Sequence, residues 1–328
     1  MLSKTVFKHR TLKLQNKIFK MIKKFKLLYK RIYQKLNYDI HKSIMINAKV
    51  LINLNNKKQD IDSLDEVDFQ VFSQRGEDGI IQYLINKIEI PNKVFIEFGV
   101  ETYTESNTRF LMMNNNWSGL VIDGDINNIN FIKNDFIYWK YDLIAIHNFI
   151  TKENINKMIS DYTKIEDIGI LSVDIDGNDY WIWDEINCIN PRIVICEYNS
   201  TFGNKKQVTV PYKSDFFRKT EHYSELYFGA SLAAFCQLAE KKGYDFIGTT
   251  AAGVNAYFVR KDLSAPFKKF TSENGFNQSA NRDSKTKTGE LAFLRHDKRL
   301  KEIEELSLFN IEKQCLEKIK NIGISNSL

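Results

Sequence analysis

The sequence predicts an α/β fold in which helices cover both faces of a doubly wound, mostly parallel sheet of seven strands. Runs rich in Val, Ile and Phe alternate with amphipathic helical patterns, which is typical of this class. Five successive strand-like runs also end in acidic residues. Open α/β sheets bind ligands at the carboxyl ends of their strands. The acids are therefore predicted to converge on one pocket.

The predicted elements follow one another along the chain. A polar connector at residues 55–65 precedes a helix that begins near Glu77, whose apolar positions recur at helical spacing. The predicted strands are residues 94–98, 119–122, 137–141, 168–173, 192–196, 246–249 and 256–259. The predicted helices between them are residues 106–115, 152–163, 180–186 and 229–242. The last two strands form a pair that closes the sheet after its final helix.

These elements divide the chain into three parts. Residues 1–65 form a basic helical arm with its connector, residues 66–263 form the sheet domain, and residues 264–328 form a C-terminal extension. Within the extension, residues 300–319 are predicted to form an amphipathic helix that makes the tail of the protein helical.

Charge is distributed very unequally along the chain. Of the 47 Lys and Arg residues, 12 lie in residues 1–38, which hold no Asp or Glu. The rest of the chain has 35 basic against 41 acidic residues, a net charge of −6. A basic amphipathic helix either lies on an anionic membrane surface or packs on its own domain or on a partner subunit. Nucleic-acid binding is disfavoured, because no basic patch with interleaved aromatic residues recurs in the body.

The cysteine content and hydropathy bound the location of the protein. Four cysteines without C-x-x-C spacing fit a reducing compartment. No apolar run approaches the roughly 18 residues that span a bilayer. We expect a cytoplasmic protein whose basic arm either touches the inner face of the cytoplasmic membrane or contributes to a homo-oligomer.

The segment at residues 93–103, KVFIEFGVETY, joins a buried strand to a polar loop and a helix. Gly99 would let the backbone approach a ligand closely, and Glu97 beside it would pair with an ammonium group or order the loop. Glu101 and Asn107 are further candidate cofactor contacts. A dinucleotide fingerprint has three glycines where this loop has one. The lack of glycine and basic residues disfavours a pyrophosphate.

Acids at the next two predicted strand ends suit a nucleoside. Asp123, with Asp125 next, is placed to accept both hydroxyls of a ribose, and Asp142 to accept the exocyclic amine of adenine. A cofactor that carries ribose, adenine and an ammonium group is S-adenosylmethionine. Any one of these acids alone would be read as a loop carboxylate or a helix cap, but their succession favours a site.

The fourth strand end carries a second acidic motif, SVDIDGNDYWIW at residues 172–183. Asp174 and Asp176 lie two residues apart, so in extended backbone they point the same way. Paired carboxylates attract a hard divalent cation such as Mg²⁺, and Glu197 and Asn199 at the next strand end are candidate further ligands. Asp174 is also a candidate cofactor contact. The alternative is a turn at Asp176 followed by a helix cap.

Four stretches together resemble the FkbM-type S-adenosylmethionine-dependent methyltransferases, and most closely the bacterial branch associated with surface glycans. They are VFIEFGVETYTESNT (94–108), NNNWSGLVIDGD (114–125), DIDGNDYWIW (174–183) and VICEYNS (194–200). The resemblance implies a Rossmann-like, methyltransferase-like sheet, with Glu97 and Gly99 in the cofactor loop, Asp123 at the ribose and Asp142 near the adenine. The loop after Gly99 lacks the second glycine common in this family.

The loop at residues 199–223 is rich in Lys, Arg and Tyr and is predicted to form a lid over the acceptor. His222 in this loop is a candidate general base, although a lone histidine in a polar loop is usually no more than that.

The sequence as a whole predicts an O-methyltransferase acting on a sugar hydroxyl of a surface glycan, or of a nucleotide-linked or lipid-linked precursor. Asp174 and Asp176 would hold the acceptor through Mg²⁺ or act directly as base. Alternatives are a glycosyltransferase that uses D-x-D carboxylates, and a non-catalytic scaffold tethered by the basic arm. A nicotinamide dehydrogenase is the weakest candidate, because the G-x-G-x-x-G loop is missing.

Overall fold

The computed structural model describes residues 21, 23–26, 28, 40–295 and 297–324. The chain divides into two units, Met1–Val50 and Leu51–Leu328. In the first unit, the described residues 21, 23–26, 28 and 40–50 are helical, and the side chains of Met21, Phe25, Leu28 and Ile46 are exposed. Most of the predicted basic arm lies outside the described residues, so its membrane or subunit contact stays a prediction.

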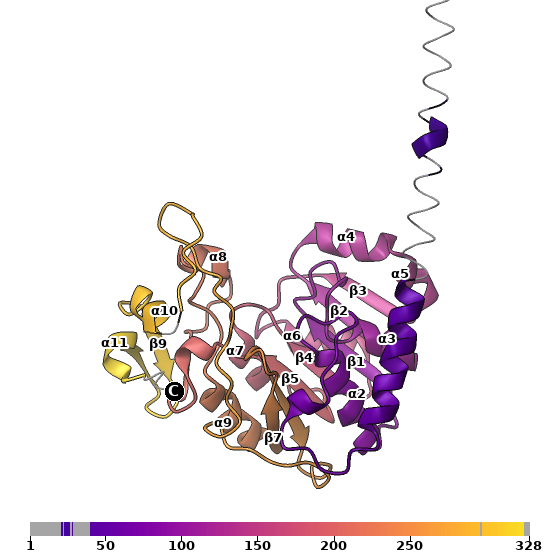
Figure 1. Cartoon of the computed structure of the whole chain (residues 1–328). Coiled ribbons are helices and arrows are strands. Elements are labelled where there is room, and N and C mark those ends of the chain that lie inside the picture. Colours follow the sequence, from indigo (N-terminus) through magenta and orange to yellow (C-terminus); the bar gives the residue numbers. More distant parts are fainter. Residues whose placement is uncertain (1–20, 22, 27, 29–39, 296, 325–328) are drawn as a thin grey trace, which may run out of the picture. The chain divides into compact units, whose positions relative to one another are not determined.

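The second unit is built on a seven-stranded sheet with the order β3-β2-β1-β4-β5-β8-β7 (Figure 1). Its strands are β1 (Val94–Phe98), β2 (Ser118–Asp123), β3 (Leu143–His147), β4 (Ile170–Val173), β5 (Ile193–Glu197), β7 (Tyr244–Thr249) and β8 (Asn255–Arg260). The five adjacent strands β3, β2, β1, β4 and β5 are parallel to one another, and β8 runs antiparallel to both β5 and β7. The predicted fold class is confirmed, including the final two-strand pair.

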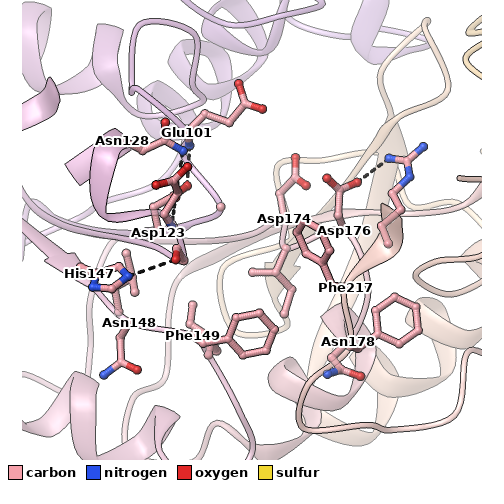
Figure 2. Close-up of a pocket in the computed structure, with 18 of the residues that line it drawn as sticks. Glu101, Asp123, Asn128, His147, Asn148, Phe149, Asp174, Asp176, Asn178 and Phe217 are labelled. Carbon is pink, nitrogen blue, oxygen red and sulfur yellow. Dashed lines mark hydrogen bonds and ion pairs between the residues drawn. The ribbon is translucent and has the colours of Figure 1, made fainter. Parts of the chain in front are cut away.

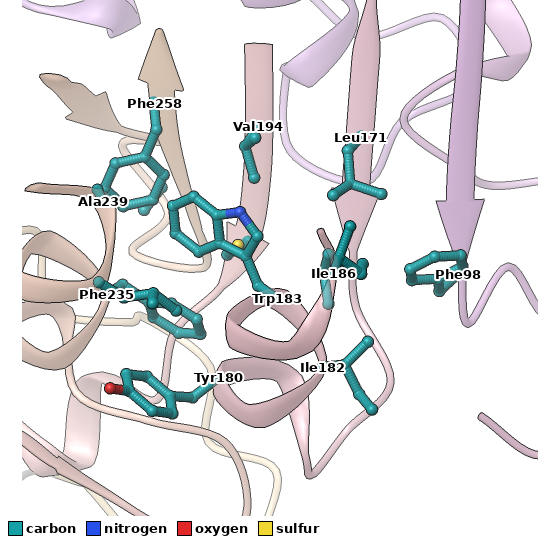
Figure 3. Packing of buried hydrophobic residues seen from close by; sticks show 14 of the residues in the cluster. Phe98, Leu171, Tyr180, Ile182, Trp183, Ile186, Val194, Phe235, Ala239 and Phe258 are labelled. Atoms are coloured by element: carbon teal, nitrogen blue, oxygen red, sulfur yellow. The ribbon is translucent and has the colours of Figure 1, made fainter. Parts of the chain in front are cut away.

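Helices cover both faces of this sheet. They are η1 (Leu64–Glu66), α2 (Glu77–Lys87), α3 (Arg109–Asn115), α4 (Ile126–Asn134), α5 (Phe136–Lys140), α6 (Ile155–Tyr162), α7 (Asp179–Glu185) and α9 (Leu232–Lys242). Because side chains alternate along a strand, Phe95 and Ile96 of β1 enter two different hydrophobic clusters. In one of them Trp183 packs on Phe235 and Phe258, with ring centroids 6.3 and 5.1 Å away (Figure 3). The indole of Trp183 therefore belongs to the core.

A third hydrophobic cluster holds together two segments that lie far apart in the sequence. The first segment, between β5 and α9, contains η2 (Ser200–Phe202), β6 (Val208–Thr209) and α8 (Arg218–Glu221). The second contains α10 (Asp297–Glu302), β9 (Ser307–Asn310), β10 (Cys315–Lys318) and α11 (Ile319–Ile322). They share a three-stranded sheet of order β10-β9-β6, and Phe202 and Phe228 pack in one cluster with Ile303 and Leu308. We call residues 199–229 and 294–324 the small subdomain.

Two predicted elements are wrong. Residues 137–141 are not the third strand: the Asp135 side chain accepts a hydrogen bond from the Ile137 amide and caps α5 there, and the strand follows at Leu143–His147. Residues 300–319 are not one helix. Their central part forms the β9–β10 hairpin, because Leu308 and Asn310 alternate with more exposed neighbours and β9 pairs with β6. Among the described residues no helix is long and apolar enough to cross a membrane.

Candidate functional site

A pocket of about 620 Å³ opens at the carboxyl ends of β3, β2, β1 and β4, which are four adjacent strands of the sheet (Figure 2). Each strand contributes lining residues where it ends: Gly99 after β1, Asp123 on β2, His147 on β3 and Asp174 after β4. The opposite wall comes from the small subdomain, which supplies Phe216, Phe217, Arg218 and Lys219. The parallel topology therefore brings Asp123, Asp174 and Asp176 to one pocket as predicted, whereas Glu97, Asp142 and Glu197 are not part of its lining.

Asp123 is the best-placed of the predicted cofactor residues. One carboxylate oxygen accepts the Glu101 amide at 2.8 Å, and the other accepts the Asp125 amide at 2.8 Å and the Asn128 side chain at 3.0 Å. Since a carboxylate offers about four acceptor positions, these three bonds leave about one position for a ligand. Asp125 also lines the pocket, and its own side chain caps α4 by accepting the Asn127 amide at 2.8 Å.

The structure gives Glu97 a structural role. Its carboxylate accepts hydrogen bonds from the backbone amides of Asn107 at 2.8 Å and Thr108 at 3.1 Å, and another from the Thr108 hydroxyl. The side chain lies outside the pocket lining, and burial raises the pKa of Glu97 to about 7. Of the two predicted roles of Glu97, the ordering of the loop is the one that the contacts support. Asn107, predicted as a cofactor contact, instead donates from its side chain to the Ser172 hydroxyl at 3.0 Å.

Gly99 is required by the protein backbone itself. Its φ is +70°, and a Cβ at this position would lie 1.6 Å from the carbonyl oxygen of Asp174. The loop that follows contains two non-glycine residues with left-handed backbone, Glu101 at φ 46° and Tyr103 at φ 59°. In this loop, residues that bear side chains therefore adopt the left-handed backbone conformation that a second glycine would adopt more easily. Glu101 itself lines the pocket.

Asp142 does not reach the pocket. It precedes β3 and is exposed at the amino end of that strand, so its predicted contact with an adenine is wrong. The carboxyl end of β3 supplies His147, Asn148 and Phe149 to the pocket instead. These residues were missed because the strand was placed six residues too early in the sequence. The only local signal for this strand is the short apolar run Leu143–Ile146 between Asp142 and His147, and a run of this length does not by itself distinguish a strand from a helix.

Three carboxylates gather where β4 and β5 end: Asp174 and Asp176 line the pocket, and Glu197 lines a small neighbouring cavity of about 30 Å³. Asp174, Asp176 and Glu197 each bring one oxygen within 4.8 Å of the others. Burial raises the pKa of Asp174 well above its usual range, and the nearby Asp176 carboxylate raises it further. The pKa of Glu197 is also raised well above its usual range, first by burial and then by Asp174. One oxygen of Glu197, Oε2, is buried and has no hydrogen-bond partner within the described part of the chain.

Asn199 and His222, the other two predicted residues on this side, have structural contacts. The Asn199 side chain accepts the Thr201 amide at 3.0 Å and donates to the carbonyl oxygens of Leu226 and Phe228, each at 3.0 Å. His222 is not part of the pocket lining, and its Nδ1 lies 2.7 Å from the Ser224 hydroxyl. The structure therefore contradicts His222 as a base in this pocket and gives Asn199 a structural role instead of a ligand role.

Arg218 is the residue on this side whose importance the sequence did not reveal. Its guanidinium forms an ion pair with Asp176 and a second one with Asp283, at 3.0 Å. It also lies over the Phe228 ring, 3.7 Å from the centroid. The sequence marks Arg218 only as one of several cations in a polar loop. Its partner Asp283 lies 65 residues away, and no local pattern connects the two.

No family model matches the sequence, and no curated protein matches it. Several solved structures are similar to part of this chain. One chain of the complex between the Haloferax volcanii Trm112 methyltransferase activator and a methyltransferase is 11% identical, with a TM-score of 0.31; the match covers 48% of this chain and 64% of that one. PKMT2 from Rickettsia typhi with AdoHcy bound is 12% identical, with a TM-score of 0.37, and the match covers 58% of this chain and 54% of that one. A SAM-dependent methyltransferase from Aquifex aeolicus is 9% identical, with a TM-score of 0.34, and the match covers 62% of this chain and 94% of that one.

The chain thus spans only about half to two thirds of the length of the first two proteins. At these TM-scores, nothing about the cofactor or substrate of those proteins carries over to this chain.

Proposed function

We propose that this protein is a methyltransferase that uses S-adenosylmethionine. The proposal rests on Asp123, which ends β2 inside the pocket and retains about one free acceptor position. A ribose hydroxyl is a donor that suits this position. The loop after β1 presents neither a glycine-rich turn nor a basic side chain, so the pocket suits a nucleoside better than a pyrophosphate.

Apolar side chains in the pocket suit the flat adenine ring. Ile126 and Phe149 both line the pocket and are 47% and 43% exposed, which is high for large hydrophobic residues. Burying them under a ligand would be favourable by roughly 25 cal/mol per Å² of apolar surface. His147 and Asn148 add polar groups at the same strand end and replace Asp142 as candidate partners of the adenine edge.

The acceptor we propose is a sugar hydroxyl of a glycan, or of a nucleotide-linked or lipid-linked precursor. Asp174 and Asp176 face the pocket and would accept hydrogen bonds from sugar hydroxyls, while the half-exposed Phe217 offers an aromatic surface to a sugar ring. The methyl group would move from the sulfonium sulfur to the acceptor oxygen in line, and the hydroxyl proton would pass to one of these carboxylates. Positioning would then contribute most of the catalysis.

The residues of the β4–β5 side fit a hard divalent cation such as Mg²⁺. Three carboxylates provide the oxygen donors that such an ion prefers, and Glu197 Oε2 is a buried oxygen without a partner among the described residues. Asp174, Asp176 and Glu197 would hold the ion. When bound, such an ion would lower the pKa of an acceptor hydroxyl.

Calorimetric titration with S-adenosylhomocysteine tests the proposal. We expect micromolar affinity, about −8 kcal/mol, and an Asp123→Asn variant that binds at least about tenfold more weakly, a loss of roughly 1.4 kcal/mol. Asp161→Asn is the matched control, because Asp161 is an exposed residue on α6 that pairs with Lys157 outside the pocket. If the wild-type protein does not bind, or if Asp123→Asn binds as tightly as wild type, the proposal is wrong.

A glycosyltransferase is the second candidate, and the carboxylate cluster is the observation that favours it. Of the two D-x-D triplets, Asp123 and Asp125 are engaged by backbone amides and a helix cap, which leaves Asp174 and Asp176 for a metal-bound nucleotide sugar. Titration with a UDP-sugar and Mn²⁺ distinguishes the two activities. The peripheral membrane contact of residues 1–38 at the cytoplasmic face, and a homo-oligomer formed through them, are further proposals.

A further inference from the structure

Arg218 is held more firmly than the carboxylate that it contacts in the pocket. Besides its bonds to Asp176 and Asp283, its Nε donates to the Glu225 carbonyl oxygen at 2.7 Å, and its guanidinium lies against Phe228. The Arg218 side chain is 15% exposed, whereas that of Asp176 is 55% exposed. We therefore expect the Arg218 side chain to be the more rigid of the two and to orient the Asp176 carboxylate.

The backbone around Asp176 is set independently of Arg218. Asp176 has left-handed backbone with φ 55°, and the Asp179 carboxylate accepts the amides on either side of it, those of Ile175 and Gly177, each at 2.8 Å. These bonds define where the Asp176 side chain begins. The Asp176 carboxylate then points to the Arg218 guanidinium, with which it forms the ion pair.

A second ion pair fixes Arg218 from behind. Asp283 lies 3.0 Å from Arg218 and 3.5 Å from Arg299. Arg299 is 6% exposed, and it donates to the Thr201 hydroxyl at 3.2 Å and to the Asn281 carbonyl oxygen at 2.9 Å. A line of alternating charges, Asp176–Arg218–Asp283–Arg299, therefore runs from the end of β4 to the second segment of the small subdomain.

The charges at the pocket end of this line do not balance. Asp174, Asp176 and Glu197 carry three negative charges when ionised, and the Arg218 guanidinium offsets one of them. The remaining charge of about −2 is what one divalent cation would neutralise. Groups that orient a ligating carboxylate typically change metal affinity by about 10- to 100-fold when they are removed.

We propose that Arg218 is a positioning residue that holds Asp176 in place to join Asp174 and Glu197 around a divalent cation, and that Asp283 positions Arg218. The inference extends the cation component of the proposed function, and it stands whether or not the nucleoside half of the pocket binds S-adenosylmethionine. It makes the C-terminal extension part of the site, although no residue of that segment would touch the ion.

Mn²⁺ titration tests this inference, because Mn²⁺ takes the same oxygen ligands and is detected directly by electron paramagnetic resonance. The proteins to compare are wild type, Arg218→Gln, Arg218→Lys and Asp283→Asn. We expect Arg218→Gln to bind Mn²⁺ about 10- to 100-fold more weakly. Arg218→Lys keeps the charge and loses the planar fork, so its affinity should lie in between. Asp283→Asn should weaken binding by a smaller factor.

The controls separate positioning from folding. Arg282→Gln removes an exposed guanidinium next to Asp283 and should leave Mn²⁺ affinity unchanged. S-adenosylhomocysteine affinity and the unfolding midpoint are measured for every variant. Asp283→Asn and Arg218→Lys keep the test decisive if Arg218→Gln does not fold.

Two results would overturn the inference. If wild type binds no Mn²⁺ in the millimolar range, there is no cation for Arg218 to serve. If the Arg218 variants bind Mn²⁺ as tightly as wild type, Arg218 does not position Asp176, and if they bind it more tightly, Arg218 competes with the cation. A failure of S-adenosylhomocysteine to bind wild type would count against the proposed function alone.

Discussion

The carboxylates at the ends of β1 and β2 are used in the opposite way from those at the ends of β4 and β5. On the β1–β2 side, Glu97 and Asp123 accept hydrogen bonds from backbone amides of the adjacent loops, so the chain itself satisfies most of their capacity. On the β4–β5 side, Asp174, Asp176 and Glu197 lie close to one another, and one Glu197 oxygen is buried without a partner among the described residues. The first side is shaped by its own backbone, whereas the second is a group of like charges that a cation or an acceptor would complete.

The largest expected effect comes from Gly99, where the two sides meet. A methyl group there would overlap the Asp174 carbonyl oxygen at 1.6 Å, so Gly99→Ala must push the ends of β1 and β4 apart. We expect it to lower the free energy of unfolding by more than about 4 kcal/mol, as measured by urea denaturation. Gly243→Ala is the matched control, because Gly243 also has positive φ but no atom lies within 4 Å of its Cβ position. The control should lose only about 1 to 2 kcal/mol. Equal losses in the two variants would mean that the contact with Asp174 does not matter.

The pH dependence of stability is the next largest effect. The pKa of Glu97 rises from 4.5 to about 7 on folding because the carboxyl becomes buried. The folded state then binds more protons than the unfolded state, so stability falls as pH rises from about 4.5 to about 7. At 1.36 kcal/mol per pKa unit the loss is about 3 kcal/mol. Asp78 and Asp179, whose pKa values burial raises to about 6, change stability in the same direction.

Thermal unfolding at pH 5 and pH 8 measures this effect in wild type and in Glu97→Gln. We expect the midpoint of the variant to fall less between the two pH values than that of wild type. If both proteins lose the same stability, Glu97 is ionised in the folded state at pH 5, and the hydrogen bonds from Asn107 and Thr108 outweigh its burial.

The smallest effect concerns the left-handed Glu101. Glu101→Gly relieves about 1 kcal/mol of backbone strain but makes the unfolded chain more flexible by a comparable amount. We expect a change in the free energy of unfolding of roughly 0.5 kcal/mol or less. Tyr103 also has positive φ, but its ring is fully buried, so Tyr103→Gly should cost several kcal/mol. A large loss in Glu101→Gly would show that its side chain, and not only its amide bond to Asp123, holds the loop.

The same contrast explains how far the sequence could predict this molecule. Residues 94–98 form β1 as predicted, and β2, β4 and β5 lie within one or two residues of their predicted positions, because each is a continuous buried run. The third strand was misplaced because FIYWK at Phe136–Lys140 is aromatic and β-branched, and short apolar runs do not distinguish strand from helix. The β9–β10 hairpin was missed because its pairing partner β6 lies about a hundred residues earlier.

The candidate site was predictable only in part, because the sequence indicates where a strand ends but not which way each side chain points. Strand ends fix which edge of the sheet an acid occupies, which is why Asp123, Asp174 and Asp176 line the pocket as expected. The sequence does not show whether a side chain at that edge faces the cavity or turns back to cap a helix. Glu97 and Asn199 turn back to bond the chain itself. The position of Arg218 depends on a partner in a distant segment, which no local pattern reveals.

The small subdomain has a consequence for the order in which the pocket is completed in the cell. Phe202 and Phe228 leave the ribosome well before Ile303 and Leu308, the residues that cover them. Domains generally begin to fold from the N-terminal side during synthesis, so the nascent chain can assemble β1 to β5 while the wall bearing Arg218 still lacks half of its core. Until the later segment emerges, those aromatic side chains lack Ile303 and Leu308 as packing partners. The β1–β2 side of the pocket would therefore form first, and the wall that bears Arg218 would be completed only after the second segment of the small subdomain has been synthesised.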